Sequence, residues 1–237
     1  MKIKSIIIII AVGIMSCSFN PVKENNGLQI VVKGNTAFGL DVYQELKDEE
    51  GNVFYSPYSI STALAMTYAG ARGQTEKEMV EVLHFSLVQE PLHSSFSKLL
   101  SELNAIQDKG YLKLSIANSL WVQEGYRFLD SFFAVNKKYY GAGLYFVDFE
   151  NQPETARKTI NALVEEKTED KIKDLIQNNV LTTFTRLILC NAVYFKGEWL
   201  HQFEKERTAD ADFNISPKKT INVPMTVSYT HLTLPTN

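Results

Sequence analysis

The chain has 237 residues, of which 45% are hydrophobic and 22% are charged, a profile typical of one large or two small globular domains. Its 24 basic and 27 acidic side chains give a formal net charge of −3 without a dense lysine and arginine stripe, which does not favour nucleic-acid binding. Two cysteines are too few for a disulfide scaffold or a cysteine-based zinc module.

The N-terminal residues predict an export signal. Lys2 and Lys4 precede an apolar run from Ile6 to Met15, which is short for a bilayer span but has the length of a signal-peptide core. The run leads to Cys17, and residues 14–17 resemble the bacterial lipoprotein box, in which cleavage leaves the cysteine as an acylated N-terminus. We therefore expect a signal peptide over residues 1–16 and a polar, lipid-anchored tether over residues 17–34.

This interpretation places the protein outside the cytoplasm. A lipid on Cys17 would attach it to a membrane, either at the cell surface or as an outer-membrane lipoprotein that faces the periplasm. The alternative is an ordinary secretory signal with an incidental cysteine, in which case the protein is secreted.

The first half of the chain then predicts four helices. Asn35 to Leu46 carries apolar residues at helical spacing, and Ser56 with Pro57 forms a helix opening in which proline supplies a pre-set φ. Residues 75–78, Thr-Glu-Lys-Glu, form a capping box that predicts the start of a third helix, and residues 96–106 form a fourth amphipathic one. After Pro57, five residues repeat at helical spacing: Ile60, Ala63, Leu64, Thr67 and Tyr68.

The middle of the chain mixes strands with helices. Leu112 to Val122 alternates apolar and polar residues, which indicates a strand buried on one face, and Asn118 on the apolar side indicates a buried hydrogen bond. A helix over Asp130 to Tyr140, a short strand over Leu144 to Phe149 and a long helix that begins at Pro153 follow.

The last predicted elements are strands. Leu187 to Phe195 reads as a strand buried on both faces, in which Cys190 is a small core residue rather than a nucleophile, because no histidine can be placed beside it. Short strands follow around Asp212 to Ile215 and Ile221 to Met225. The pattern predicts a mixed α and β domain.

No motif in the sequence assembles an enzyme. There is no Gly-x-Ser-x-Gly elbow, no His-Glu-x-x-His pair and no phosphate-binding P-loop, since residues 70–75 lack the lysine and follow a helix. His84, His93, His201 and His231 do not have metal-ligand spacing. We therefore expect no catalytic residue, cofactor, metal or small-molecule substrate.

Several segments, in order, resemble the serpin family of protease inhibitors. Residues 52–60, Asn-Val-Phe-Tyr-Ser-Pro-Tyr-Ser-Ile, and residues 69–79 look like the short strand, core helix and following turn of that family. Residues 191–199, Asn-Ala-Val-Tyr-Phe-Lys-Gly-Glu-Trp, are similar to its most recognisable segment. The resemblance covers residues 35–225.

The resemblance implies an α+β fold in which helices pack around a large, mainly antiparallel β-sheet. It also implies an inhibitor of serine proteases, or in some cases of cysteine proteases, that acts as a suicide substrate. After the protease cleaves an exposed reactive-centre loop and is held as an acyl-enzyme, the loop inserts as an extra strand beside the strand at residues 186–195.

The resemblance also assigns site residues by position. Ser56, Ser59 and Asn191 match the polar cluster where the sheet parts, known as the shutter, and Trp199 matches the breach, where insertion begins. Two hydroxyls and a buried amide can exchange hydrogen bonds as strands separate. For Ser56, simple capping of the helix is an equal alternative.

The chain departs from the family pattern in three places. Leu163 stands where the family usually has tryptophan and Asp170 where it usually has glycine, and we expect both changes to be tolerated on a surface helix. After Met225 the family continues through the reactive-centre loop, whereas residues 226–237 match no serpin element and are interpreted as a non-homologous tail on a C-terminally truncated chain. The alternative function is a non-inhibitory serpin that acts as a surface binding or structural protein.

Overall fold

Two long strands, β1 (Leu112–Gln123) and β3 (Leu187–Gly197), form the centre of the computed structural model, which describes residues 24–107, 112–199 and 203–226. They pair antiparallel along their lengths, from Leu112 opposite Gly197 to Val122 opposite Leu187. The short strand β2 (Gly143–Val147) pairs in parallel with the end of β1, so the sheet order is β2-β1-β3. The expected signal peptide, Cys17 and the tail after Thr226 lie outside the described residues.

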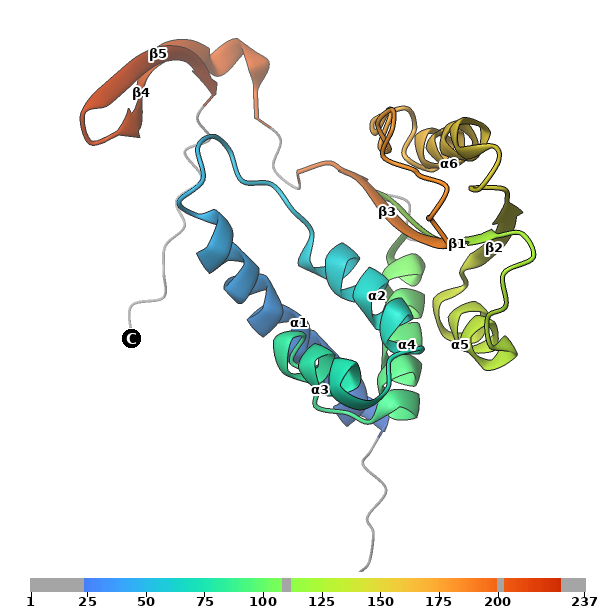
Figure 1. Cartoon of the computed structure of the whole chain (residues 1–237). Helices are drawn as coiled ribbons and strands as arrows, with labels where there is room; N and C mark the ends of the chain where they lie inside the picture. Colours follow the sequence, from blue (N-terminus) through green and yellow to red (C-terminus); the bar gives the residue numbers. More distant parts are fainter. Residues whose placement is uncertain (1–23, 108–111, 200–202, 227–237) are drawn as a thin grey trace, which may run out of the picture.

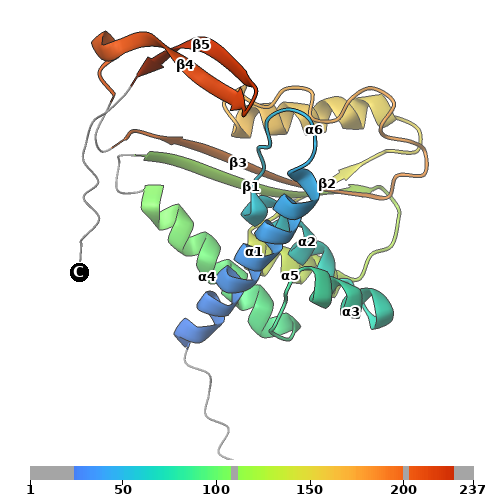
Figure 2. The ribbon, with the colours of Figure 1, turned by 90° about the vertical axis from the view of Figure 1, so that its left-hand side faces the viewer.

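Helices cover both faces of this sheet (Figures 1 and 2). Five lie on one face: α1 (Glu24–Leu46), α2 (Pro57–Tyr68), α3 (Gly73–Val82), α4 (Gln89–Gln107) and α5 (Asp130–Tyr140). The helix α6 (Pro153–Lys167) lies on the opposite face. The predicted α+β class, with helices packed around a sheet, is confirmed, and the longest strand pairing is antiparallel.

Each face of the sheet has its own hydrophobic core. Leu120 and Val122 of β1 point to the first core, which contains Phe96 of α4 and Tyr140 of α5. Trp121 points to the other face and packs in a second core with Phe149, Ile160 and Cys190. Because successive strand residues point to opposite faces, one strand supplies both cores.

The second half of β1 is therefore buried on both faces, and the predicted one-sided burial is wrong. Ser119, Trp121 and Gln123, on the side expected to be solvated, are all buried. Trp121 is part of the second core, which lies under α6. Apolar and polar residues alternate at the start of β1, and this pattern does not indicate the second core, because that core covers only the end of the strand.

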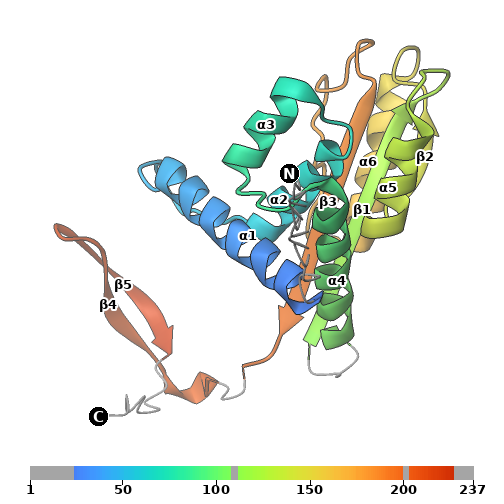
Figure 3. The ribbon, with the colours of Figure 1, turned by 90° about the horizontal axis from the view of Figure 1, so that it is seen from below.

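The remaining two strands form a separate hairpin. β4 (Thr208–Ser216), preceded by the short 3-10 helix η1 (Lys205–Arg207), pairs antiparallel with β5 (Lys219–Thr226). Figures 1 and 3 show this hairpin standing away from the helices. Both strands occur where the sequence predicts them. Among the described residues, no helix is both long enough and apolar enough to span a membrane.

Three helices, α1, α3 and α4, begin earlier than the sequence pattern predicts, and α4 does so at Gln89 rather than at Phe96. α1 begins at Glu24 rather than Asn35, so residues 24–34, expected to belong to a polar tether, are helical. The buried Val31 and half-buried Leu28 extend the apolar stripe of this helix backwards at helical spacing, which explains the difference.

The predicted capping box is also wrong. α3 begins at Gly73, so Thr75 lies inside the helix, and Arg72 at the N-cap makes no side-chain cap bond. Gly73 has a φ of 64°, a conformation that glycine adopts without strain, and this lets the chain turn into the helix two residues early. Glu78 instead accepts a hydrogen bond from Gln74, one helical turn away.

Candidate functional site

The candidate site begins at the first turn of α2. Ser56 has an extended backbone, and its Oγ accepts a hydrogen bond from the Ser59 backbone N–H at 3.2 Å. Pro57 occupies the first helical turn, where its missing N–H has no intrahelical partner to lose. Ser56 is therefore the N-cap of α2, and this cap holds Ser59 in the first turn.

A chain of side-chain hydrogen bonds runs from Ser59 into the sheet. The Ser59 hydroxyl donates to Asn191 Oδ1 on β3. Asn191 Nδ2 donates to Asn118 Oδ1 on β1 at 2.6 Å, and Asn118 Nδ2 donates to the Tyr140 carbonyl of α5 at 2.9 Å. Asn118 and Asn191 lie directly opposite each other in the β1–β3 pairing. Four elements, α2, β3, β1 and α5, are thus joined by polar contacts within an apolar core.

The polar chain has the chemistry expected where a sheet opens. Asn118 is buried, so losing a partner costs about 1–3 kcal/mol. Hydroxyl and amide groups each hold several donors or acceptors, so such groups can exchange hydrogen-bond partners.

The structure brings together only part of the predicted site. Ser59 and Asn191 are in direct contact, as the family position suggests. Ser56 acts on Ser59 as a helix cap and makes no hydrogen bond to Asn191 within the described part of the chain, in agreement with the alternative stated for it. Trp199 lies two residues beyond the end of β3, is 73% exposed, and packs edge-to-face on Phe203.

Sequence reasoning also missed a buried amide behind the site. Asn136 of α5 is fully buried, and its Nδ2 donates to the Met66 carbonyl of α2 and to the Phe132 carbonyl. It therefore ties α5 to α2 at the back of the polar chain. The sequence does carry a signal for this buried amide, because Asn136 lies one helical turn from each of the apolar residues Phe132 and Tyr140.

The outer edge of β3 is the other feature of the site. Within the described ranges, β3 pairs with β1 on one side only. The predicted burial of this strand on both faces holds only in part: Cys190, Ala192 and Tyr194 on one face are buried, the residues between them are half-buried, and Phe195 is 66% exposed. An unpaired strand edge can accept a further strand through its backbone N–H and C=O groups.

The comparisons with known proteins identify the family. The sequence profile described as Serpin (serine protease inhibitor) matches residues 33–233. The chain belongs to the serpin family. The matched segment includes Ser56, Ser59, Asn191 and Trp199, and it extends beyond residue 225 into the expected tail.

Related serpins support this membership. The leukocyte elastase inhibitor of the pig, Sus scrofa, is 44% identical over 193 residues, which are 81% of this chain and 50% of that protein. The human leukocyte elastase inhibitor is 41% identical over 193 residues, with the same coverage. This serpin chain therefore spans about half the length of the curated relatives that it matches.

Solved structures have the same fold. Ovalbumin from the emu, Dromaius novaehollandiae, gives a TM-score of 0.78 at 31% identity, over 83% of this chain and 54% of that one. Cleaved kallistatin complexed with heparin gives a TM-score of 0.76 at 30% identity, over 84% of this chain and 58% of that one.

The serpin strand β3 also carries Cys190. Its thiol is buried opposite Ser119 of β1, and burial raises its pKa from the ordinary 9.0 to about 11. The thiol is therefore protonated at neutral pH, whereas a nucleophile needs the thiolate. The predicted core role of Cys190 is confirmed.

One of the two sequence departures lies in a different place from that expected. Leu163 lies on the helix α6, as expected, where it is half-buried and packs against the second core. Asp170 lies beyond the end of α6 and has a φ of 59°. This left-handed conformation favours glycine, and aspartate is one of the residues that tolerate it. The usual glycine of the family at this position thus has a backbone explanation.

Proposed function

We propose that the serpin to which this chain belongs inhibits serine proteases as a suicide substrate. The observation that carries the proposal is the polar chain from Ser59 through Asn191 to Asn118, which joins α2 to both long strands of the sheet. A sheet that must accept an inserted strand beside β3 needs contacts that can re-form when the strands separate.

The proposed reaction begins with the protease. Its catalytic serine attacks the scissile carbonyl of the reactive-centre loop, the peptide C–N bond breaks, and the loop remains bound through an ester. The cleaved loop then adds to the edge of β3 as a new strand, which displaces the attached protease and distorts its active site. The inhibitor chain supplies no catalytic group. It supplies strand pairing, which stabilises the inserted form.

The first targets to test are elastase-like serine proteases. The relatives at 41–44% identity are called leukocyte elastase inhibitors, and this suggests the class of enzyme for a first assay. Cysteine proteases form a second panel, because the same insertion can trap a thioester.

The test is a mixture of the full-length protein with an elastase. We expect a complex that survives denaturing electrophoresis and has the summed mass of the protease and the cleaved inhibitor. A protease whose catalytic serine is replaced by alanine is the matched control and gives no such band. Cleavage of the inhibitor without a stable complex, with every protease tested, would indicate the non-inhibitory alternative.

We also propose that a lipid on Cys17 anchors the protein to a membrane outside the cytoplasm. Support comes from Lys2 and Lys4, the apolar run after them and the cysteine at its end. We expect the expressed protein to partition into detergent and to carry a mass increase from acyl chains, and the Cys17→Ser variant to lose both. Equal partitioning of the variant and the original protein into the aqueous phase would indicate an ordinary secretory signal.

A further inference from the structure

The short strand β2 forms one margin of the three-stranded sheet and pairs, within the described residues, with β1 alone. Figure 3 shows β2 on one side of the molecule and the hairpin of β4 and β5 on the opposite side. Three consecutive side chains of β2 are exposed, those of Leu144, Tyr145 and Phe146, and Phe146 is 56% exposed. This margin of the sheet therefore presents apolar side chains to solvent.

The pairing with β1 shows which backbone groups of β2 face outwards. Val147 lies opposite Gln123, and its carbonyl accepts the Glu124 N–H at 3.0 Å, so the backbone groups of Val147 face β1. Successive residues of a strand direct their N–H and C=O groups to alternate sides. The backbone groups of Leu144 and Phe146 therefore face away from β1, where no other described strand pairs with them.

This edge lacks the features that normally prevent a strand from pairing with another chain. Proteins protect exposed edges with charged side chains, prolines or β-bulges. The strand β2 reads Gly-Leu-Tyr-Phe-Val, which contains neither a charge nor a proline, and its register with β1 is continuous. An edge of this composition favours a partner strand over solvent.

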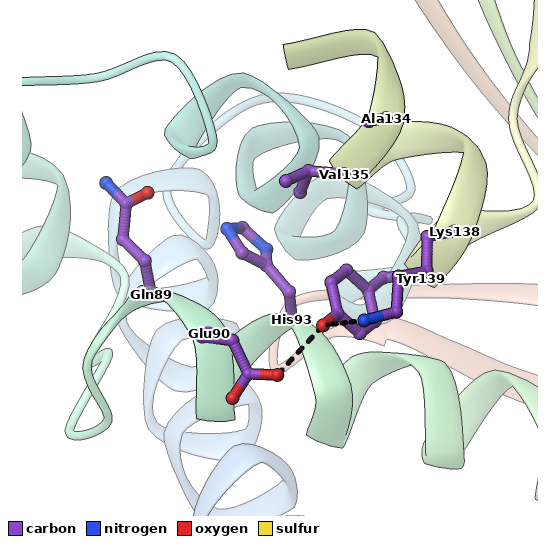
Figure 4. Close-up of a pocket in the computed structure, with 7 residues that line it drawn as sticks. All are labelled: Gln89, Glu90, His93, Ala134, Val135, Lys138 and Tyr139. Carbon is purple, nitrogen blue, oxygen red and sulfur yellow. Dashed lines mark hydrogen bonds between the residues drawn. The ribbon is translucent and has the colours of Figure 1, made fainter. Parts of the chain in front are cut away.

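Charges of opposite sign flank the two ends of β2. The last turn of α5, which precedes the strand, carries Lys137 and Lys138. Lys138 donates to the Tyr139 hydroxyl at 2.6 Å (Figure 4), whereas the exposed Lys137 makes no ion pair within the part of the chain that the structure describes. Asp148 follows the strand directly, and Glu150 beyond it is exposed. The strand therefore has a basic end and an acidic end.

We propose that β2 is a dimer interface, in which the strands of two copies of the chain pair antiparallel about a two-fold axis at Tyr145. Leu144 then lies opposite Phe146 of the partner subunit, so the outward N–H and C=O groups of both residues find partners in each copy. Antiparallel pairing also brings the basic end of one strand to the acidic end of the other, whereas parallel pairing would place like charges together. The interface uses no residue of the polar chain that carries the proposed inhibition, so either proposal can fail alone.

A small cavity beside the strand gives space for the opposing side chain. Its volume is about 110 Å³. Its lining consists of Leu120, Phe133, Ala134, Lys137, Ala142 and Leu144. Phe146 lies on the same face of β2 as Leu144, and its ring meets Phe133 edge-to-face with centroids 6.5 Å apart. In the proposed register, Phe146 of the partner subunit lies beside Leu144 at the wall of this cavity, where an aromatic and an aliphatic side chain form a favourable cross-strand pair.

The first test is disulfide formation across the two-fold axis, in the full chain with Cys17→Ser. Tyr145→Cys places two thiols directly opposite each other at a Cα spacing of about 4.5 Å, which a disulfide can bridge. We expect a dimer on denaturing electrophoresis that disappears on reduction. Leu144→Cys and Phe146→Cys should each form at least about tenfold less dimer alone, because two-residue offsets separate their thiols, and should cross-link when the two variants are mixed.

The second test is sedimentation of the full chain over a range of concentrations, with two lysine variants. Phe146→Lys adds the charge that protected edges carry and should weaken dimerisation at least about tenfold, whereas Val82→Lys, at a 63% exposed position on α3, should leave it unchanged. A chain that stays monomeric, association that Phe146→Lys leaves intact, or equal cross-linking of Leu144→Cys and Tyr145→Cys would each overturn the proposal. If Tyr145→Cys does not fold, the two lysine variants decide the outcome.

Discussion

Asn191 is the residue on which the polar chain depends, because it is both acceptor and donor. Its Oδ1 receives the Ser59 hydroxyl and its Nδ2 donates to Asn118. Without the Asn191 side chain, Ser59 and Asn118 would each lose one hydrogen-bond partner. An apolar replacement would therefore leave polar atoms of two other elements without these partners, and one of them, on Asn118, is buried.

We predict that Asn191→Ala lowers the free energy of unfolding by about 2 kcal/mol, because a buried acceptor on Asn118 and the Ser59 hydroxyl lose their partners. Urea unfolding measures the change. Ser59→Ala combined with Asn191→Ala should destabilise less than the sum of the single changes, since the two share one bond. The matched control is Ser101→Ala at an exposed position on α4, which should stay within about 0.5 kcal/mol of the original protein. Full additivity of the pair would contradict the contact.

His93 predicts a specific loss of stability in acid. Its pKa is about 4 in the folded protein and 6.5 ordinarily, so between these values the unfolded chain binds a proton that the folded chain does not. The contribution of His93 to stability is thus complete above pH 6.5 and falls as the pH decreases to 4, by up to about 1.4 kcal/mol per pH unit. Burial is the main cause of the lowered pKa, whereas Glu90 opposes the loss of the proton and Arg72 favours it.

The measurement for His93 is the free energy of unfolding at several pH values for the original protein and His93→Gln. Subtracting the two curves removes the titration of the carboxylates common to both. We expect the difference to change between pH 6.5 and 4 and to be flat above pH 6.5. A difference that is constant over the whole range would mean that His93 keeps an ordinary pKa.

At the scale of elements, helices and strands could be predicted from the sequence because their periodicity is local. The strands at Leu112 and Leu187 and the helices at Asp130 and Pro153 occur where the pattern places them. The face that each element buries depends on its neighbours. α2 buries Ser61, Thr62, Ala65, Met66 and Tyr68.

The helical spacing predicted for α2 is confirmed, but of its five residues Tyr68 is buried and Ile60 packs against the first core, whereas Leu64 and Thr67 are exposed. Small residues such as Ser61 and Ala65 let α2 approach β3 and α4, and the spacing of large apolar residues alone does not identify these small buried positions.

The candidate site was predictable only in part. The pairing of Ser59 with Asn191 followed from the serpin resemblance, and the buried hydrogen bond of Asn118 followed from its place in an apolar strand face. The contribution of Tyr140 could not be predicted, because the acceptor is a backbone carbonyl at the end of a helix. Such contacts depend on tertiary packing, so the residue types in the sequence do not indicate them.

The end of α6 gives a prediction at the scale of an element. Asp170 has a φ of 59°, so Asp170→Gly should raise the free energy of unfolding by about 0.5–1 kcal/mol through relief of the left-handed strain. Asp170→Ala also removes the charge but keeps the Cβ, and it should give no gain. Thermal unfolding of the three proteins is the measurement. A similar gain from alanine would show that charge, and not backbone conformation, is responsible.

At the scale of the whole molecule, β1 lies between two hydrophobic cores and contributes side chains to both. Leu120 and Val122 belong to the core under α1 to α5, and Trp121 between them belongs to the core under α6. The two layers also have separate helices and no core residue in common. Whether they behave as one unit depends on the strand that separates them.

We predict that both layers unfold in a single transition, because loss of either core leaves one face of β1 exposed and removes support from the other. In a Trp199→Phe background, Trp121 fluorescence reports the α6 side and far-UV circular dichroism reports mainly the other helices. The two urea curves should coincide. Ile160→Ala and Phe96→Ala, one in each core, should shift both curves together by about 2–5 kcal/mol. If Ile160→Ala moved the fluorescence curve alone, α6 would be a separate unit that can leave the sheet while the opposite layer stays folded.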